Sequence, residues 1–153
     1  MGTEEALSIT RDWITALRSG KYEQGRGSLI DYHYPDGYEH HSDGYEYCCL
    51  GVLCEILGFN LKEILKEGVE DLETTDVSRI TGHPYATMIC QEQFPIQIPN
   101  IELAEKVGKK NDFTYTDAIR LGIINDQDVD FNTIAWIIEH SIVPHLEAKL
   151  QLA

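Results

Sequence analysis

The residues with the clearest chemical potential form a short loop, residues 20–28, after the first predicted helix. Arg18, Lys21 and Arg26 lie in or beside this loop, next to Gly25 and Gly27, and form a local basic cluster in an acidic chain. Gly25 and Gly27 leave room for backbone N–H groups to approach an anion, and an arginine binds phosphate through two hydrogen bonds. The pattern predicts a site for a small phosphorylated ligand. It is neither a Walker nor a Rossmann motif, because the glycine spacing differs and no Lys-Ser/Thr pair follows.

Tyrosines close to this loop extend the prediction to a nucleotide-type ligand. Tyr22, Tyr32 and Tyr34 have aromatic rings on which a nucleobase can stack. The predicted ligand-binding residues are Arg18, Lys21, Tyr22, Gln24, Gly25, Arg26, Gly27 and Tyr32. The alternative interpretation is a solvated loop between a helix and a hairpin, with no ligand.

The four cysteines, Cys48, Cys49, Cys54 and Cys90, contain no C-x-x-C pair. Neither a zinc ribbon nor a thioredoxin-type site is therefore indicated, and reduced thiols are expected. Cys48 and Cys49 begin a predicted helix, where the helix dipole lowers a thiol pKa, so a nucleophilic cysteine is one hypothesis. No catalytic signature surrounds them, and Cys54 belongs to an apolar stripe, so packing is the favoured role.

Two stretches of the sequence resemble metal-binding patterns but lack the required spacing of ligands. His40 and His41 precede the cysteines, but Cys49 and Cys54 are five residues apart on a predicted helix and do not converge as zinc ligands do. Residues 126–130 imitate the start of a calcium loop but lack the glycine at its sixth position and the carboxylate at its twelfth. The sequence predicts no bound metal, no cofactor and no catalytic group.

Charge separates the chain into three segments. Acids outnumber bases 26 to 12 among 153 residues, which gives a formal net charge of −14 and excludes a protein that coats duplex DNA. Residues 1–30 have no net charge, residues 31–105 carry −12, and the remainder carries −2. The acidic middle is interpreted as a solvated surface, or alternatively as a face that docks on a basic host protein or mimics a nucleic-acid backbone.

Apolar periodicity places helices over about residues 4–19 and 48–57. Asn100, which follows Pro99, is expected to open a short helix through Val107, and Asn60 and Thr116 to cap two others. Asp130 or Asn132 begins a last helix, which Pro144 bends or ends. Aromatic alternation around two Asp-Gly pairs between residues 31 and 47 predicts an antiparallel hairpin. Residues 85–90 are expected as a strand, residues 94–99 as extended chain, and residues 69–83 as an acidic loop.

These elements predict one α+β domain over residues 1–153, built from several short helices and a small antiparallel sheet or hairpin. No run of about 18 apolar residues is present, so no membrane-spanning helix is expected. The first residues lack a secretory apolar stretch, which predicts an intracellular, soluble protein.

Three blocks of the chain resemble a family of small uncharacterised bacteriophage proteins. They are Trp13 with residues 16–22 (ALRSGKY), Gln24, Gly25 and Gly27, then residues 47–54 (YCCLGVLC), and a tail of LGIIND at 121–126 with FNTIAWIIE at 131–139. The tyrosine- and histidine-rich segment 31–46 is longer than this family leads one to expect. The resemblance implies an origin and carries no established activity.

A phage origin directs the functional hypotheses toward host defence. We expect a non-enzymatic accessory protein in the host cytoplasm that sequesters a small nucleotide-type signal. The alternatives are an acidic inhibitor that docks on a host protein and, with less support, a cysteine-nucleophile enzyme. The sequence also leaves open whether the protein forms a homo-oligomer.

Overall fold

The chain folds into helices around a small sheet, as described by a computed structural model for residues 2–32, 44–66, 68, 71–111 and 120–152. The helices are α1 (Thr3–Arg18), α2 (Cys49–Ile56), α3 (Leu61–Leu65), α4 (Thr74–Thr81), α5 (Pro84–Cys90), α6 (Ile101–Asn111), α8 (Leu121–Asp126) and α9 (Phe131–Leu152). The strands are β1 (Glu23–Gln24), β2 (Ile30–Tyr32) and β3 (Tyr45–Tyr47). The α+β class is confirmed.

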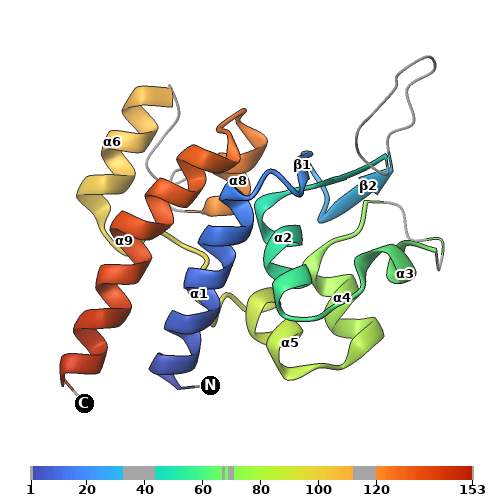
Figure 1. Cartoon of the computed structure of the whole chain (residues 1–153), viewed down its shortest axis with the longest axis horizontal. Coiled ribbons are helices and arrows are strands. Elements are labelled where there is room, and N and C mark those ends of the chain that lie inside the picture. The colour runs from blue at the N-terminus through green and yellow to red at the C-terminus, as the bar shows by residue number, and fades with distance from the viewer. Residues whose placement is uncertain (1, 33–43, 67, 69–70, 112–119, 153) are drawn as a thin grey trace.

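Two antiparallel helices, α1 and α9, lie side by side and form the most extensive contact between elements (Figure 1). Their facing sides are apolar: Trp13, Ile134 and Ile138 are fully buried. In Figure 1, α6 lies beyond α9, while α2 and the sheet lie on the other side of α1. The Trp13 indole Nε1–H also donates to the Cys49 carbonyl at 2.8 Å, so one buried side chain joins α1 to α2.

The sheet is mixed, which corrects the expectation of a purely antiparallel one. Its strand order is β1-β3-β2, with β2 antiparallel and β1 parallel to β3. Tyr32 pairs with Tyr45 and Ile30 with Tyr47, as the hairpin prediction requires. The Asp36-Gly37 turn and Asp43 lie outside the described residues. The parallel partner was missed because a two-residue strand leaves no alternation in the sequence.

Gly51 lets α2 pass directly against the chain before β2. A Cβ atom at this position would lie 1.8 Å from the Leu29 carbonyl oxygen, which is backbone and cannot move aside. The same carbonyl accepts a hydrogen bond from the Cys48 N–H at 3.3 Å. Any side chain at Gly51 would therefore separate α2 from the sheet.

Two sequence predictions between residues 69 and 90 are wrong, because helix signals there are local caps rather than periodicity. Residues 85–90 belong to helix α5, which begins at Pro84, and His83 Nδ1 accepts the Tyr85 N–H at 3.1 Å. The expected acidic loop contains helix α4, which ends at Gly82 with a φ of 60°. Each helix buries few side chains of its own, and the two are stabilised by packing on one another.

The last helix starts as predicted but extends further. The Asp130 carboxylate caps it by accepting the Thr133 N–H at 2.8 Å. Pro144 does not end the helix, which continues to Leu152. Leu146 beyond the proline is buried in the core, so packing outweighs the hydrogen bond that Pro144 cannot donate.

The buried apolar side chains of the described residues form one core cluster that runs from α1 through α2 to α9. Within these ranges, no helix combines the length and apolar character needed to cross a membrane.

Candidate functional site

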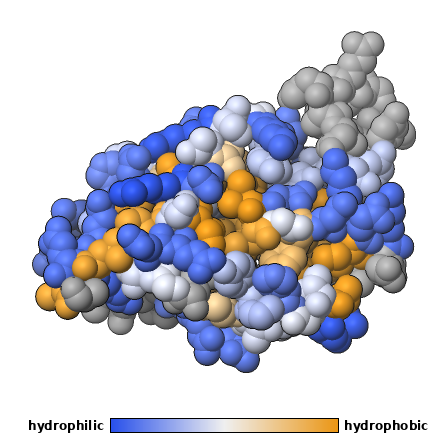
Figure 2. Space-filling view, turned by 60° about the horizontal axis from the view of Figure 1, so that its bottom comes forward, coloured by the Kyte–Doolittle hydropathy of each residue, from blue (hydrophilic) through white to orange (hydrophobic). Residues whose placement is uncertain are grey.

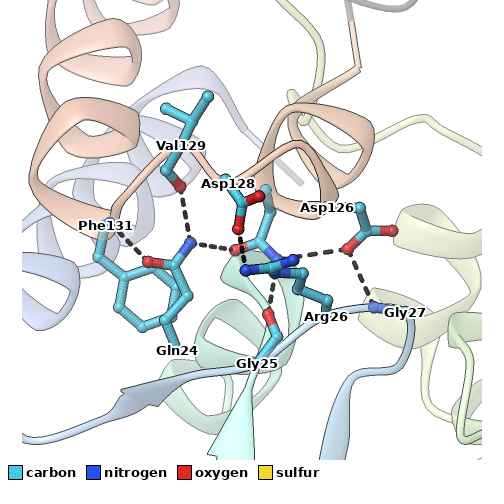
Figure 3. Close-up of polar contacts among 9 residues, drawn as sticks. Gln24, Gly25, Arg26, Gly27, Asp126, Asp128, Val129 and Phe131 are labelled. Atoms are coloured by element: carbon cyan, nitrogen blue, oxygen red, sulfur yellow. Dashed lines mark hydrogen bonds and ion pairs between the residues drawn. The ribbon is translucent and has the colours of Figure 1, made fainter.

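The predicted glycine loop is held against the segment between α8 and α9 by the Gln24 side chain (Figure 3). Its amide nitrogen donates to the Val129 carbonyl at 2.7 Å and to Asn125 Oδ1 at 3.0 Å. Its amide oxygen accepts the Phe131 N–H at 3.0 Å. Gln24 therefore uses its hydrogen-bonding groups within the protein, although the sequence suggested a ligand contact.

Asn125 is the fully buried centre of this contact. Its Nδ2 donates to the Gly25 carbonyl at 2.8 Å, and its Oδ1 accepts the Cys49 N–H at 3.1 Å in addition to Gln24. One side chain thus joins the glycine loop, the first residue of α2 and the end of α8. We refer to Gln24–Gly27 and residues 125–131, joined in this way, as the interlock.

The glycines and Arg26 serve the same contact. The Gly27 N–H donates to Asp126 Oδ1 at 3.0 Å, and Arg26 forms an ion pair with Asp128. Gly25 is buried, and a Cβ there would lie 2.8 Å from the Glu46 Cβ. The sequence assigned the Gly27 N–H and the Arg26 guanidinium to an anionic ligand, but both bind carboxylates of the same chain.

Arg18 lies outside the interlock and joins α1 to α9. Its guanidinium binds Glu139 through two hydrogen bonds of 2.9 and 3.1 Å. The hydrogen bond from Arg18 lowers the pKa of Glu139, and the bond to Glu139 in turn raises the pKa of Arg18. Both side chains are exposed, so the pair contributes little to stability but directs the Arg18 charge to a partner.

The remaining predicted residues gather around one set of rings. Tyr22 packs edge-on against Tyr47 with ring centres 5.1 Å apart, and Tyr32 packs in the same way against Tyr45 at 5.0 Å. Because Tyr45 and Tyr47 are two residues apart on β3, they point to the same side of the sheet. We name these four residues the tyrosine face. Tyr34, which the sequence also suggested, lies outside the described residues.

Two lysines flank the tyrosine face. Lys21 Nζ lies 5.4 Å from the centre of the Tyr22 ring, and Lys62 Nζ lies 4.9 Å from that of Tyr45. Half-buried Glu55 lies nearby, and burial raises its pKa. A hydrogen bond from Tyr47 and the charges of the two lysines act in the opposite direction but do not outweigh burial. The alternation of Tyr45 and Tyr47 could have revealed both residues in the sequence, whereas nothing local distinguishes Lys62 on α3.

The cysteines are placed as core residues. Cys48, Cys49 and Cys54 are buried, and Cys48 Sγ caps α2 by accepting the Gly51 N–H at 3.4 Å. Burial raises the pKa of Cys48 to about 11 and that of Cys49 well above its usual value. The expectation of a thiol pKa lowered by the start of α2 is therefore wrong, because desolvation outweighs the dipole.

The ranges that the structure describes contain no group of three or more His, Cys, Asp or Glu side chains able to hold a metal ion. His40 and His41, named in the zinc hypothesis, lie outside them.

Two hollows adjoin these elements. A groove of about 330 Å³ lies between α1, α9 and residues 92–99, with Phe94, Ile98 and Leu146 in its lining. Figure 2 views the molecule from the side of both termini, where apolar residues form a band across the surface. A smaller pocket of about 190 Å³ adjoins the interlock and is lined by Gly27, Asp126 and residues of α2 and α4, among others.

A family model described as a domain of unknown function, DUF8296, matches residues 6–142. The chain belongs to the DUF8296 family. The matched range includes the interlock and the tyrosine face, so both lie within the family's domain. Neither the curated proteins nor the solved structures contain a match to the chain.

Replacing Asn125 with alanine should strongly destabilise this DUF8296 domain. The substitution leaves the Cys49 N–H and the Gly25 carbonyl without their partner in a buried position, which should cost roughly 3–5 kcal/mol of unfolding free energy. Urea denaturation followed by circular dichroism measures the change. The control is Asn60→Ala at the exposed cap of α3, expected to cost about 1 kcal/mol. Equal losses in the two variants would contradict the central role of Asn125.

Alkylation should distinguish the buried thiols from Cys90, which is only partly buried. With a pKa of about 11, Cys48 is a thiolate in about one molecule in a thousand at pH 8. Brief treatment of the folded protein with iodoacetamide at pH 8 should modify Cys90 alone, and treatment in urea should modify all four cysteines, as read by mass spectrometry. Modification of folded Cys48 as fast as Cys90 would revive the cysteine-nucleophile hypothesis.

Proposed function

We propose that this DUF8296 protein is a bacteriophage accessory protein that counters a host defence by sequestering a small nucleotide-type ligand at the tyrosine face. One observation supports this assignment above the others. Three of the residues singled out from the sequence, Lys21, Tyr22 and Tyr32, lie together with a second lysine and two further tyrosines.

The chemistry of the tyrosine face suits a base and a phosphate together. The Tyr32 side chain is 48% exposed and offers an aromatic surface for stacking. The ammonium groups of Lys21 and Lys62 are point charges that suit phosphate oxygens. Arg18 and Arg26, which the sequence assigned to phosphate, are paired with Glu139 and Asp128.

The phage origin rests on the three sequence blocks that resemble small bacteriophage proteins. Such a protein would act in the host cytoplasm, where signalling nucleotides are made and sensed. Sequestration requires only binding, which agrees with a face built from stacking and charged groups.

A panel of cyclic and ADP-ribose-type nucleotides should contain a ligand that raises the melting temperature of the protein. Tyr32→Ala should weaken its binding about tenfold, because stacking on an aromatic side chain contributes roughly 1–3 kcal/mol per base. The double variant Lys21→Gln/Lys62→Gln should weaken it by a similar factor, whereas Lys106→Gln on the exposed side of α6 should not. Isothermal titration calorimetry measures the affinities. A panel without any ligand for the folded protein would refute the proposal.

A second candidate function is docking of an acidic surface on a basic host protein. The observation that favours it is that every acidic side chain in the described ranges is exposed or half-exposed. These side chains include Asp71 and Glu73 in the segment that carries most of the negative charge. A surface of one sign attracts an opposite partner over about a Debye length, so salt should weaken the complex.

Retention of a host protein on the immobilised chain should fall steeply between 50 and 500 mM NaCl if docking is the function. Asp71→Asn/Glu73→Gln should lower retention at 50 mM NaCl, and Glu4→Gln/Asp12→Asn on α1 is the control with the same change in charge. Quantitative mass spectrometry of the bound fraction measures both effects. Binding that is indifferent to salt and to both pairs of substitutions would exclude an acidic docking surface.

A further inference from the structure

The pocket beside the interlock has apolar walls and an acidic rim. Leu29, Leu50 and Leu72 supply the apolar lining, and two acidic residues belong to the same lining: Glu73, the N-cap residue of α4, and Asp126 at the end of α8. Glycines at positions 27 and 122 leave the space of about 190 Å³ open. A Cβ at Gly27 would meet nothing within 4 Å, and one at Gly122 would approach only the end of the Leu50 side chain.

The interlock leaves one side of the Asp126 carboxylate available. Asp126 Oδ1 accepts the Gly27 N–H at 3.0 Å and contacts Asn125 Nδ2 at 3.4 Å. In Figure 3 the second oxygen of Asp126 points away from these donors. Neighbouring Arg26 does not cancel this charge, because its guanidinium is paired with Asp128.

We propose that this pocket receives an arginine side chain of a basic partner protein. The inference rests on the second proposed function, docking on a basic host protein, and gives that function a specific contact. Charge complementarity determines the occupant: the leucines would cover the three methylene groups, and Glu73 and Asp126 would accept hydrogen bonds from the guanidinium. The Thr74 hydroxyl in the same lining is a further acceptor.

Arginine fits this pocket better than lysine or a neutral side chain. A guanidinium presents five N–H donors in a plane, so it can reach two carboxylates at once, that of Glu73 before α4 and that of Asp126 in α8. It is also more weakly hydrated than an ammonium group, and so loses less on entering an apolar pocket. A neutral side chain of the same shape would leave two carboxylates uncompensated.

Nuclear magnetic resonance with N-acetyl-arginine methylamide tests the pocket without any host protein. Titration to 100 mM should shift the amide signals of Ser28, Thr74 and Gly122, and the matched citrulline and lysine analogues should bind at least about fivefold more weakly. Glu73→Gln/Asp126→Asn should reduce the affinity for the arginine analogue about tenfold. Asparagine at position 126 still accepts the Gly27 N–H, so the interlock is retained.

Two further variants separate the pocket from the general acidity. Glu102→Gln/Glu105→Gln on α6 makes the same change in charge and should leave binding unchanged, while Gly122→Leu should fill the pocket and abolish binding with all charges intact. A thermal melt of each variant verifies its folding, and Gly122→Ala replaces the leucine variant if that variant does not fold. Equal binding of the lysine analogue, shifts spread evenly over acidic residues, or no shift at 100 mM would each overturn the proposal.

The experiments distinguish failure of the proposed arginine pocket from failure of the proposed docking on a host protein. If the analogue does not bind but retention of a host protein still depends on salt and on Asp71 and Glu73, docking stands without this pocket. If the analogue binds at the predicted amides and no host protein is retained, the pocket stands and docking on a host protein fails.

Discussion

The architecture depends on the hydrogen bonds of one buried amide, that of Asn125. An amide without partners in a protein interior costs several kcal/mol, so its position is set by the groups that satisfy it. Those groups belong to segments far apart in the chain: Gly25 and Gln24 in the first quarter, and Cys49 at the start of α2. The hydrogen bonds of the Asn125 amide are complete only when all three segments are in place. This requirement fixes β1, α2 and α8 relative to one another.

This constraint explains why a glycine- and arginine-rich loop in this chain need not be an anion site. Backbone N–H groups and guanidinium groups bind any suitably placed oxygen, whether it belongs to a phosphate or to an aspartate. In a chain with a net charge of −14, carboxylates are the most abundant charged groups that carry such oxygens. Asp126 and Asp128 occupy the positions relative to Gly27 and Arg26 that the sequence had assigned to a ligand.

Helices with a clear apolar stripe and a capping residue could be predicted from the sequence. Asn60 and Asp130 accept the N–H groups expected of caps, and α1 and α2 lie where periodicity placed them. Helix α6 begins after Asn100, as predicted, but extends beyond the expected end near Val107 to Asn111. Elements that depend on tertiary packing could not be predicted: α4 and α5 stabilise one another, and β1 exists through its pairing with β3.

In the candidate site too, some residues could be placed from the nearby sequence and others could not. Tyr22 and Tyr32 belong to the tyrosine face and Lys21 flanks it, because their neighbours along the chain carry them to the same sheet. Arg18 is paired with a glutamate 121 residues away, which no local pattern reveals. A sequence can thus indicate which residues are equipped for a ligand, while the pairing of distant charges decides which of them can meet one.

The pairing of charges within the chain also changes the charge of the ligand that we expect beside the glycine loop, from negative to positive. Read locally, residues 20–28 are basic, and the sequence predicts an anion there. When residues 125–131 close on the loop, Asp128 neutralises Arg26 and Asp126 takes up the Gly27 N–H with one oxygen. Glu73 and Asp126, the latter through its remaining oxygen, are then the charged residues in the lining of the neighbouring pocket. A cation is the occupant that we propose there, while the proposed contacts to phosphate fall to the lysines of the tyrosine face.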